Sequence, residues 1–208
     1  MSNFTSFKQS FKGDISTPTD ADYAQAISRW ASNAQVNAKI VAFVKNPEDV
    51  VLAIAYAREN CLPIAIRGGG HSTAGASSTE GLVIDLSRHL NTVEIDPENK
   101  LAYVGGGAIW EQVDKASILH GLATVAGTVG HVCCTQIILN ISFCLTSSRL
   151  ESEGMTCLYL FFCDAVSYFF SSRLTLGGGV GQLSGEHGLV IDNLIKVFLF
   201  GLNHVISA

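Results

Sequence analysis

The sequence predicts an α+β domain, because helix and strand patterns follow one another without a regular strand–helix–strand series. Two strand candidates in succession and then a hairpin do not fit a doubly wound parallel sheet. The nucleotide-binding fingerprints also fail: the glycines at 68 and 70 lack a third partner at Thr73 and lead into a loop, and no G-x-x-x-x-G-K-[ST] run occurs. With 48% hydrophobic and 15% charged residues, the 208-residue chain can bury a substantial core.

The first predicted element is a helix over residues 20–32, within an N-terminal helical segment that we place at residues 1–36. Asp20 is the expected N-cap, and the apolar face carries Tyr23, Ile27 and Trp30.

A strand, a helix and a second strand are predicted next, over residues 39–44, 47–60 and 62–66. Proline is favourable in the first turn of a helix, so Pro47 opens the helix. Its apolar stripe is predicted to consist of Val50, Val51, Ile54 and Ala55.

After a further strand at residues 82–86, residues 92–95 and 101–104 flank the turn-rich connector 96–100 and predict a hairpin. The last predicted helix covers residues 108–119, and Gly121 is its expected C′ residue. Its apolar face is predicted to use Ile109, Val113 and Ala116.

The stretch from Arg67 to Ser72, R-G-G-G-H-S, is the most informative in the chain. Three glycines allow positive φ and close approach of a partner to the backbone N–H groups, which together form an anion-binding concavity. Arg67 can pair with a phosphate, and His71 is a nucleophile or a pH-tuned donor. A simple reversal of the chain is the alternative.

A second glycine-rich region comprises residues 127–131 and 174–188. Two glycine clusters more than a hundred residues apart, both near a histidine, favour a surface that lies against a large planar ligand. The alternative is that they are tight turns of a compact domain.

Charge and cysteine content exclude several classes of function. A net charge of −5 and a pI near 5.6, with no Lys/Arg cluster, argue against nucleic-acid and anionic-membrane surfaces. No spaced Cys/His set predicts a metal site, and five of the six cysteines fall between residues 133 and 163. Residues 1–20 lack the pattern of a secretory signal, so a cytoplasmic protein without a disulfide framework is expected.

Five ordered segments together resemble the vanillyl-alcohol-oxidase flavoproteins, in particular the berberine-bridge-enzyme-like and 6-hydroxy-D-nicotine-oxidase-like branch. The resemblance covers roughly residues 37–131 and 174–195. The five segments are IRGGGHSTAG, LVIDLS, GGGAxW, GTVGH and LTLGGGVGQLSGEHGLVIDNL.

The resemblance implies a p-cresol-methylhydroxylase-type FAD-binding domain with two α+β subdomains, placed at residues 37–208 and incomplete at the C-terminus. The family's substrate domain and general base are expected to be absent from this chain. The family would bind the FAD pyrophosphate with the loop at 67–72 and attach the flavin 8α-methyl carbon covalently to His71. Residues implied to contact FAD are Arg67, Gly68, Gly69, Gly70, His71, Ser72, Gly127, Thr128, His131, Gly178, Gly179 and Val190.

The pattern of the family breaks at residues 132–173 and again at the tail, 197–208. Relatives have only a few residues between the histidine and L-T-L, where this chain has 42 with two apolar stretches, at 137–145 and 157–170. We interpret residues 132–173 as an atypical insert, such as non-coding sequence translated in frame; a transmembrane hairpin is the alternative, although neither stretch has the about 18–20 apolar residues of a span.

The resemblance implies an FAD-linked oxidase, in which a small-molecule substrate delivers hydride to flavin N5 and dioxygen reoxidises the flavin to give hydrogen peroxide. Bicovalent relatives carry a cysteine where this chain has Val129, so a single bond through His71 is expected. The alternative is a truncated, inactive FAD-binding module or a misfolded product, and His187 is no more than a candidate lining residue.

Overall fold

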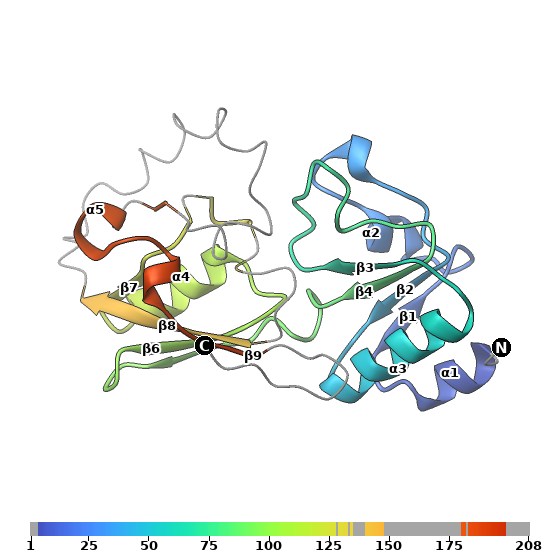
Figure 1. Ribbon diagram of the computed structural model, residues 1–208, viewed down its shortest axis with the longest axis horizontal. Coiled ribbons are helices and arrows are strands. Elements are labelled where there is room, and N and C mark those ends of the chain that lie inside the picture. Colours follow the sequence, from blue (N-terminus) through green and yellow to red (C-terminus); the bar gives the residue numbers. More distant parts are fainter. Residues whose placement is uncertain are drawn as a thin grey trace.

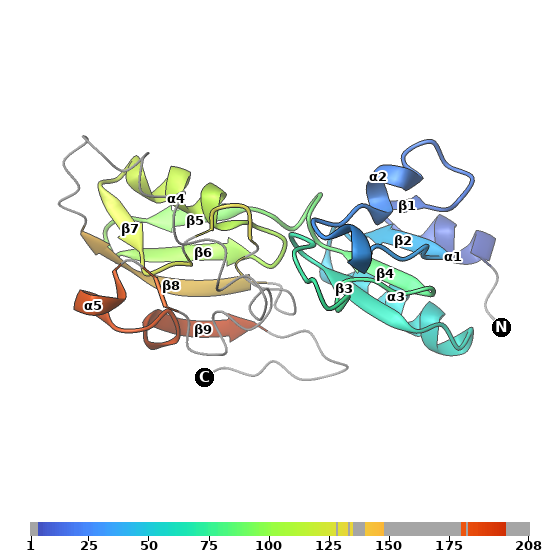
Figure 2. The ribbon, with the colours of Figure 1, turned by 90° about the horizontal axis from the view of Figure 1, so that it is seen from above.

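The computed structural model describes residues 4–127, 129–132, 134, 140–147, 180–181 and 183–198. These residues form two α+β parts that lie side by side, each built on its own sheet (Figures 1 and 2). The mixture of helices and sheets confirms the predicted fold class.

The first part contains a four-stranded sheet in the order β1-β2-β4-β3. Strands β2, β4 and β3 are parallel, whereas β1 pairs antiparallel with β2. The elements of this part are α1 (Phe4–Ser10), β1 (Asp14–Ser16), α2 (Tyr23–Ile27), η1 (Ser32–Ala34), β2 (Ile40–Phe43), α3 (Pro47–Glu59), β3 (Ile64–Arg67) and β4 (Leu82–Asp85).

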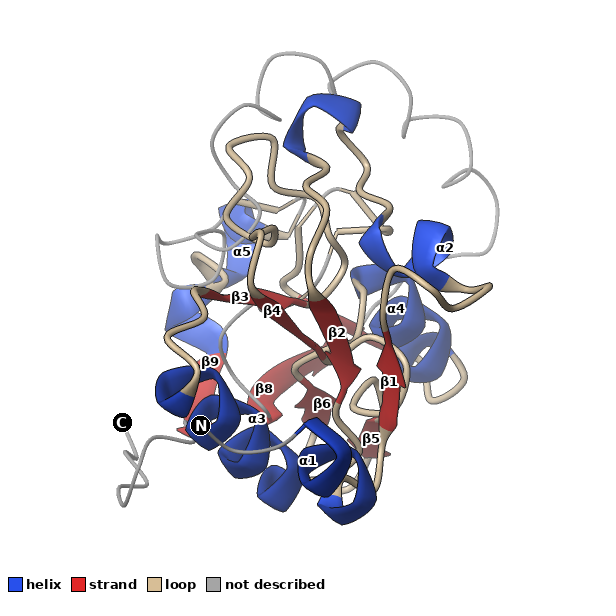
Figure 3. Cartoon of the chain, turned by 90° about the vertical axis from the view of Figure 1, so that its right-hand side faces the viewer, coloured by secondary structure: helices blue, strands red, loops and turns tan. Residues whose placement is uncertain are grey.

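Both faces of this sheet are covered, α1 and α3 packing on one and α2 on the other (Figure 3). Alternate residues of the strands divide between the faces, as the period of a strand requires. Ile40, Ala42, Leu82 and Ile84 pack against α1 and α3, and Val41, Phe43 and Val83 pack toward α2. All residues of β2 and β4 are therefore buried, which is typical of central parallel strands.

Helix α3 begins as predicted, but its buried face differs from the prediction. The Asn46 side chain accepts a hydrogen bond from Asp49 N at 2.9 Å, and Pro47 occupies the first turn. The buried residues include Val50, Ala53 and Ala57, whereas Val51 and Ala55 are exposed. Ala53 and Ala57 are small, so the helix can approach the sheet closely. The predicted stripe left out both residues, because apolar residues occur on several sides of this helix.

The predicted helix over residues 20–32 is shorter than expected. It begins at Tyr23, with Asp22 as the N-cap, and it ends at Ile27, because Ser28 has extended backbone angles. Asp20 instead accepts hydrogen bonds from the amide and hydroxyl of Thr17. Trp30 therefore lies outside the helix and is 57% exposed, so its predicted place on the apolar face of that helix is wrong.

The second part contains a sheet in which β5 and β6 form the predicted antiparallel hairpin. Strand β8 pairs antiparallel with β6, β7 and β9. The elements of this part are β5 (Val93–Asp96), β6 (Leu101–Gly105), α4 (Trp110–Ile118), β7 (Leu122–Thr124), β8 (Asn140–Ser147), α5 (Ser184–His187), η2 (Ile191–Asn193) and β9 (Leu194–Phe198).

Helix α4 supplies the core of this part. Trp110 and Val113 are fully buried together with Ala102, Val104 and Val190. Gly121 follows the helix with a φ of +65°, but the C-cap is Leu119, so Gly121 lies one residue beyond the C′ position predicted for it. Ser117 is buried on this face, whereas the predicted face residues Ile109 and Ala116 are only partly buried.

Residues 140–147 of the predicted insert form strand β8. The remainder of the apolar stretch 137–145 and all of 157–170 lie outside the described residues, as does most of the tail 197–208. No helix in the described ranges is long and apolar enough to cross a membrane. The interpretation of residues 132–173 as translated non-coding sequence stays a prediction about the transcript.

A backbone contact at Gly107 holds the second part against the segment that follows β4. Gly107 N donates a hydrogen bond to Leu90 O at 2.8 Å, whereas Gly105 N donates to Thr92 O at 2.8 Å and extends the β5–β6 hairpin. A Cβ at Gly107 would lie 2.1 Å from Leu86 O, so only glycine fits there. The segment that leaves β4 is thus held against the segment that leaves β6.

Candidate functional site

The candidate site begins where β3 ends, at the loop of residues 68–72. Gly68, Gly70 and Ser72 are buried, and Gly70 has a φ of +72° that favours glycine. A Cβ at Gly70 would lie 3.1 Å from Arg67 Nε and 3.4 Å from Arg29 Cδ. The loop therefore folds tightly over two arginine side chains.

In this loop several carbonyl groups have hydrogen-bond partners, whereas the N–H groups lack them among the described residues. The carbonyl groups of Arg67, Gly70 and Thr73 accept hydrogen bonds from Leu86 N, Trp30 N and Asn33 Nδ2 respectively. The backbone N–H groups of residues 68–72 donate to no acceptor among the described residues. Backbone donors in a largely buried loop need a partner, and consecutive free donors form a concavity that binds anions.

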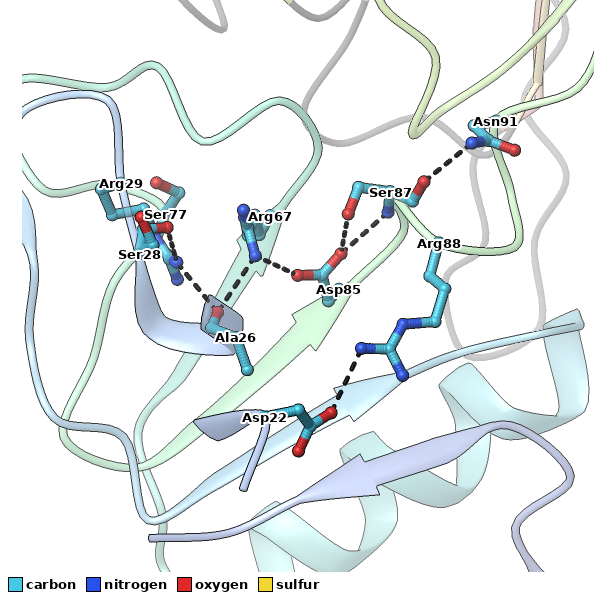
Figure 4. Close-up of polar contacts among 10 residues, drawn as sticks. All are labelled: Asp22, Ala26, Ser28, Arg29, Arg67, Ser77, Asp85, Ser87, Arg88 and Asn91. Carbon is cyan, nitrogen blue, oxygen red and sulfur yellow. Dashed lines mark hydrogen bonds and ion pairs between the residues drawn. The ribbon is translucent and has the colours of Figure 1, made fainter. Parts of the chain in front are cut away.

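The Arg67 side chain points toward Asp85 and the carbonyl group of Ala26 (Figure 4). Its Nη1 donates to Asp85 Oδ2 at 2.8 Å and to Ala26 O at 3.0 Å, while its Nε is buried without a partner among the described residues. Asp85 is fully buried and also accepts from the amide and hydroxyl of Ser87, at 2.8 and 2.6 Å. Arg67 thus ties the end of β3 to β4, and its predicted contact with a pyrophosphate stays a prediction.

Arg29 is a second buried cation, and the sequence analysis missed it. Its guanidinium donates to the carbonyl groups of Ala26, Ser28 and Ser77 (Figure 4). Burial, followed by the charge of Arg67, lowers the pKa of Arg29 to about 10, and the charge of Asp85 partly offsets this. Arg67 pairs with Asp85, and Arg29 bonds to carbonyl groups only, so two guanidinium groups and one carboxylate lie beside the loop with unpaired amides. The excess of positive charge favours an anion there.

Histidine rings meet at the exit of the loop. The His71 ring stacks on the Trp30 ring, with centroids 4.8 Å apart and planes at 24°, and its centroid lies 4.5 Å from that of His131. Burial, followed by the charge of His131, lowers the pKa of His71 to about 4. The His71 imidazole is therefore neutral at pH 7, the form in which a ring nitrogen can act as a nucleophile.

The contact with His131 joins the two predicted cofactor segments, which lie about sixty residues apart in the sequence. Residues 130–132 are held at the start of α4, because Glu111 N donates to Gly130 O at 2.7 Å and Trp110 N to Val132 O at 3.1 Å. Gly127 precedes this segment and is half-buried.

The remaining predicted residues do not all lie at this site. Thr128, Gly178 and Gly179 are outside the described residues. Val190 is fully buried, and its side chain belongs to the core around Trp110. Ser72, predicted at the pyrophosphate, accepts a hydrogen bond from Ala76 N at 3.2 Å and so helps to shape the loop. His187 is exposed.

A surface cleft beside β1 holds none of the predicted residues. It is lined by Lys8, Gly13, Asp14, Ile15, Asp22 and Arg88. Its charged groups pair with one another, since Arg88 contacts Asp14 at 3.1 Å and Asp22 at 3.3 Å. No group of metal-binding side chains occurs within the described ranges.

The fold and the site define the class of protein. The family model described as "FAD binding domain" matches residues 38–167, and the chain belongs to this family. The match ends inside the predicted insert. The resemblance to vanillyl-alcohol-oxidase and berberine-bridge-enzyme-like flavoproteins is thereby confirmed, and the curated relatives are named FAD-linked oxidoreductases and oxidases.

Curated relatives and solved structures support the same family assignment. The chain is 31% identical over 191 residues to the uncharacterized FAD-linked oxidoreductase YgaK of Bacillus subtilis, covering 91% of this chain and 34% of the relative. It is 27% identical over 191 residues to (R)-6-hydroxynicotine oxidase of Paenarthrobacter nicotinovorans, covering 91% and 33%. The chain thus spans about a third of the length of the curated relatives it matches.

Two solved structures show the same fold. The crystal structure of 6-hydroxy-D-nicotine oxidase from Arthrobacter nicotinovorans matches with a TM-score of 0.65 at 27% identity, covering 88% of this chain and 32% of that one. BBE-like 1 of Physcomitrella patens matches with a TM-score of 0.73, covering 100% and 38%, and at 20% identity this likeness concerns the fold.

Proposed function

We propose that this chain holds FAD covalently through His71 and contributes the cofactor-binding part of an oxidase. The observation that carries the proposal is the run of five N–H groups at residues 68–72 without an acceptor among the described residues, beside the buried guanidinium group of Arg29 and the partly buried one of Arg67. A diphosphate fits this arrangement, because it offers oxygen acceptors and negative charge together.

The residues divide between the two ends of the cofactor. The amides of the 68–72 loop would hold the diphosphate, with Arg29 and Arg67 supplying positive charge beneath them. Gly127, Thr128, His131, Gly178 and Gly179 would line the isoalloxazine and ribityl side, and the main chain near Val190 would contact the cofactor. Bound FAD supplies the hydride and electron chemistry, while the protein supplies orientation and electrostatics.

His71 would make the covalent attachment with a neutral ring nitrogen, which would replace one hydrogen of the 8α-methyl group and give up its own N–H hydrogen. The two electrons and two protons released in this step would pass to dioxygen and give hydrogen peroxide. One covalent bond is proposed, because Val129 offers no thiol.

For catalysis we propose that a small-molecule substrate with an oxidisable C–H bond gives hydride to the flavin and that dioxygen is the acceptor. The proposal names no particular substrate, and it assigns the role of catalytic base to no residue of this chain. We further propose that the protein acts in the cytoplasm, which cell fractionation with an antibody to the chain would test.

The test is the colour and the denatured fluorescence of the purified 208-residue chain after incubation with FAD. A yellow protein whose band fluoresces in acid after denaturing electrophoresis supports the proposal. His71→Ala should abolish the fluorescence of the denatured band, whereas the matched control His120→Ala, an exposed histidine on the far end of α4, should keep it. Flavin that stays attached in His71→Ala would show that another residue carries the bond.

The second candidate is a catalytically inactive FAD-binding module. A yellow, covalently labelled chain that consumes no dioxygen with any amine or sugar substrate would point to it. A colourless preparation would contradict both candidates.

A further inference from the structure

Trp30 contacts the proposed attachment residue, yet no sequence motif assigned it a role. It lies beyond the end of α2, and more than half of its side chain is exposed to solvent. An exposed tryptophan that packs in no core cluster needs a reason. Its one ring partner among the described residues is His71.

The backbone holds Trp30 against the loop independently of the ring contact. Trp30 N donates a hydrogen bond to Gly70 O at 3.2 Å, one residue before His71. Three residues further on, Asn33 Nδ2 donates to Thr73 O at 3.3 Å. Residues 30–33 are therefore anchored along residues 70–73, and the indole is fixed over the imidazole by more than its own stacking.

We infer that Trp30 is a positioning residue for His71, one that fixes the plane of the imidazole and shields it from water so that a ring nitrogen is presented to the flavin. This inference rests on the proposed function. Aromatic rings at this separation attract one another in offset-stacked geometry, and the large indole limits the rotamers open to a histidine on a glycine-rich loop. A histidine on such a loop without a stacking partner would sample several orientations.

Burial of the imidazole accounts for its neutral state, and the stack on Trp30 is one of the contacts that cover the ring. Loss of solvation is the largest cause that lowers the pKa of His71, and the charge of His131 is the second. Of the groups that contact the His71 ring, Trp30 carries no charge, and His131 is the titratable one.

Two substitutions of similar size separate the aromatic face from simple bulk. Trp30→Phe keeps a ring that can stack, and Trp30→Leu keeps an apolar side chain without one. Leu119→Ala is the control, since Leu119 is an exposed apolar residue at the end of α4. The full chain of each variant is mixed with excess FAD, and covalent flavin is followed over time by fluorescence of the acid-denatured band.

Trp30→Leu is expected to slow covalent incorporation about three- to tenfold, the range of one aromatic pair, and Trp30→Phe to stay near the parent. Incorporation by Trp30→Leu at the parent rate would overturn the inference. A slowed Leu119→Ala would also count against it, because the effect would then not be specific to the stack.

A second readout needs no FAD and separates failure of the inference from failure of the proposed function. Nuclear magnetic resonance titration of the His71 ring, assigned with His71→Gln, should show its pKa rising from about 4 toward 6.5 in Trp30→Leu. An unchanged pKa would sink the positioning role even if the parent never acquires flavin. A raised pKa in a chain that never acquires flavin would keep the positioning role and reject the covalent cofactor.

Discussion

Removal of the Asp85 carboxylate is the most demanding test of how the glycine loop is held. Asp85 is fully buried, and it is the acceptor for Arg67 and for both donors of Ser87. In Asp85→Ala, Arg67 would lose its carboxylate partner, and the charges of Arg67 and Arg29 would face each other without the nearby carboxylate. Breaking a buried ion pair by removing one partner costs about 3–5 kcal/mol, so we expect a loss of that size in the free energy of unfolding.

Asp14 provides a matched control for this substitution. Its carboxylate also accepts from an arginine, Arg88, at 3.1 Å, and from His89 at 2.9 Å, but about half of its side chain is exposed. The hydrogen bond from His89 and the contact with Arg88 lower the pKa of Asp14, yet exposed pairs contribute only about 0–1 kcal/mol to stability. Asp14→Ala should therefore be nearly neutral.

Urea unfolding followed by circular dichroism measures both variants against the parent chain. Asp85→Asn should lose less than Asp85→Ala, because the amide oxygen can still accept from Ser87 while the charge is lost; hydrogen bonds to charged groups contribute about 1.5–3 kcal/mol. If Asp85→Ala lost no more stability than Asp14→Ala, Arg67 would not be held by β4, and the account of the loop would be wrong.

Three further predictions concern the loop and the junction. Gly70→Ala should lose more stability than Gly75→Ala in urea unfolding. Both glycines have positive φ, which costs a substituted side chain about 1–2 kcal/mol, but only a Cβ at residue 70 crowds Arg67. Equal losses would refute the crowding. Covalent incorporation should be nearly as fast at pH 5.5 as at pH 7.5, because a His71 pKa of about 4 leaves the ring neutral at both; an ordinary pKa near 6.5 predicts a fall of about tenfold instead. Gly107→Ala should lower the free energy of unfolding by about 1–3 kcal/mol or prevent folding, since its Cβ would overlap Leu86 O. Gly185→Ala has open space around its Cβ and should leave the stability unchanged. The thermal midpoint of each variant measures the difference.

The strands were predictable because their signals are local. Residues 40–43 and 82–84 are continuous apolar runs, and the strands β2 and β4 that contain them are buried on both faces. The hairpin between residues 93 and 105 follows from a turn-rich connector between two apolar stretches. The topology, in which β4 lies between β2 and β3, depends on pairing distant in sequence and was not predicted.

Helix faces were less predictable, and Trp30 shows why. Its spacing from Tyr23 and Ile27 fits one side of a helix, but the helix ends at Ile27 and the indole packs on His71. Periodicity tells which residues share a face; it cannot tell a core contact from a contact with a site residue. In α3 the predicted stripe included Val51, which is exposed, and left out Ala53, which is buried.

The candidate site was predictable as far as its backbone is concerned. Three glycines after a strand indicate a loop with free amides, and this is the arrangement that the structure has. The buried position of Arg29 and the inward direction of Arg67 depend on Asp85 and on carbonyl groups of other segments. No local signal in the sequence marks such long-range partners.

The most direct test of the central proposal is peptide mapping of the flavin. The chain is incubated with FAD, denatured and digested with trypsin, and the flavin-bearing peptide is sequenced by mass spectrometry. We predict one modified peptide, which begins at Gly68 and carries the flavin on His71. Flavin on any other residue, or protein that binds FAD and releases all of it on denaturation, would contradict the proposal.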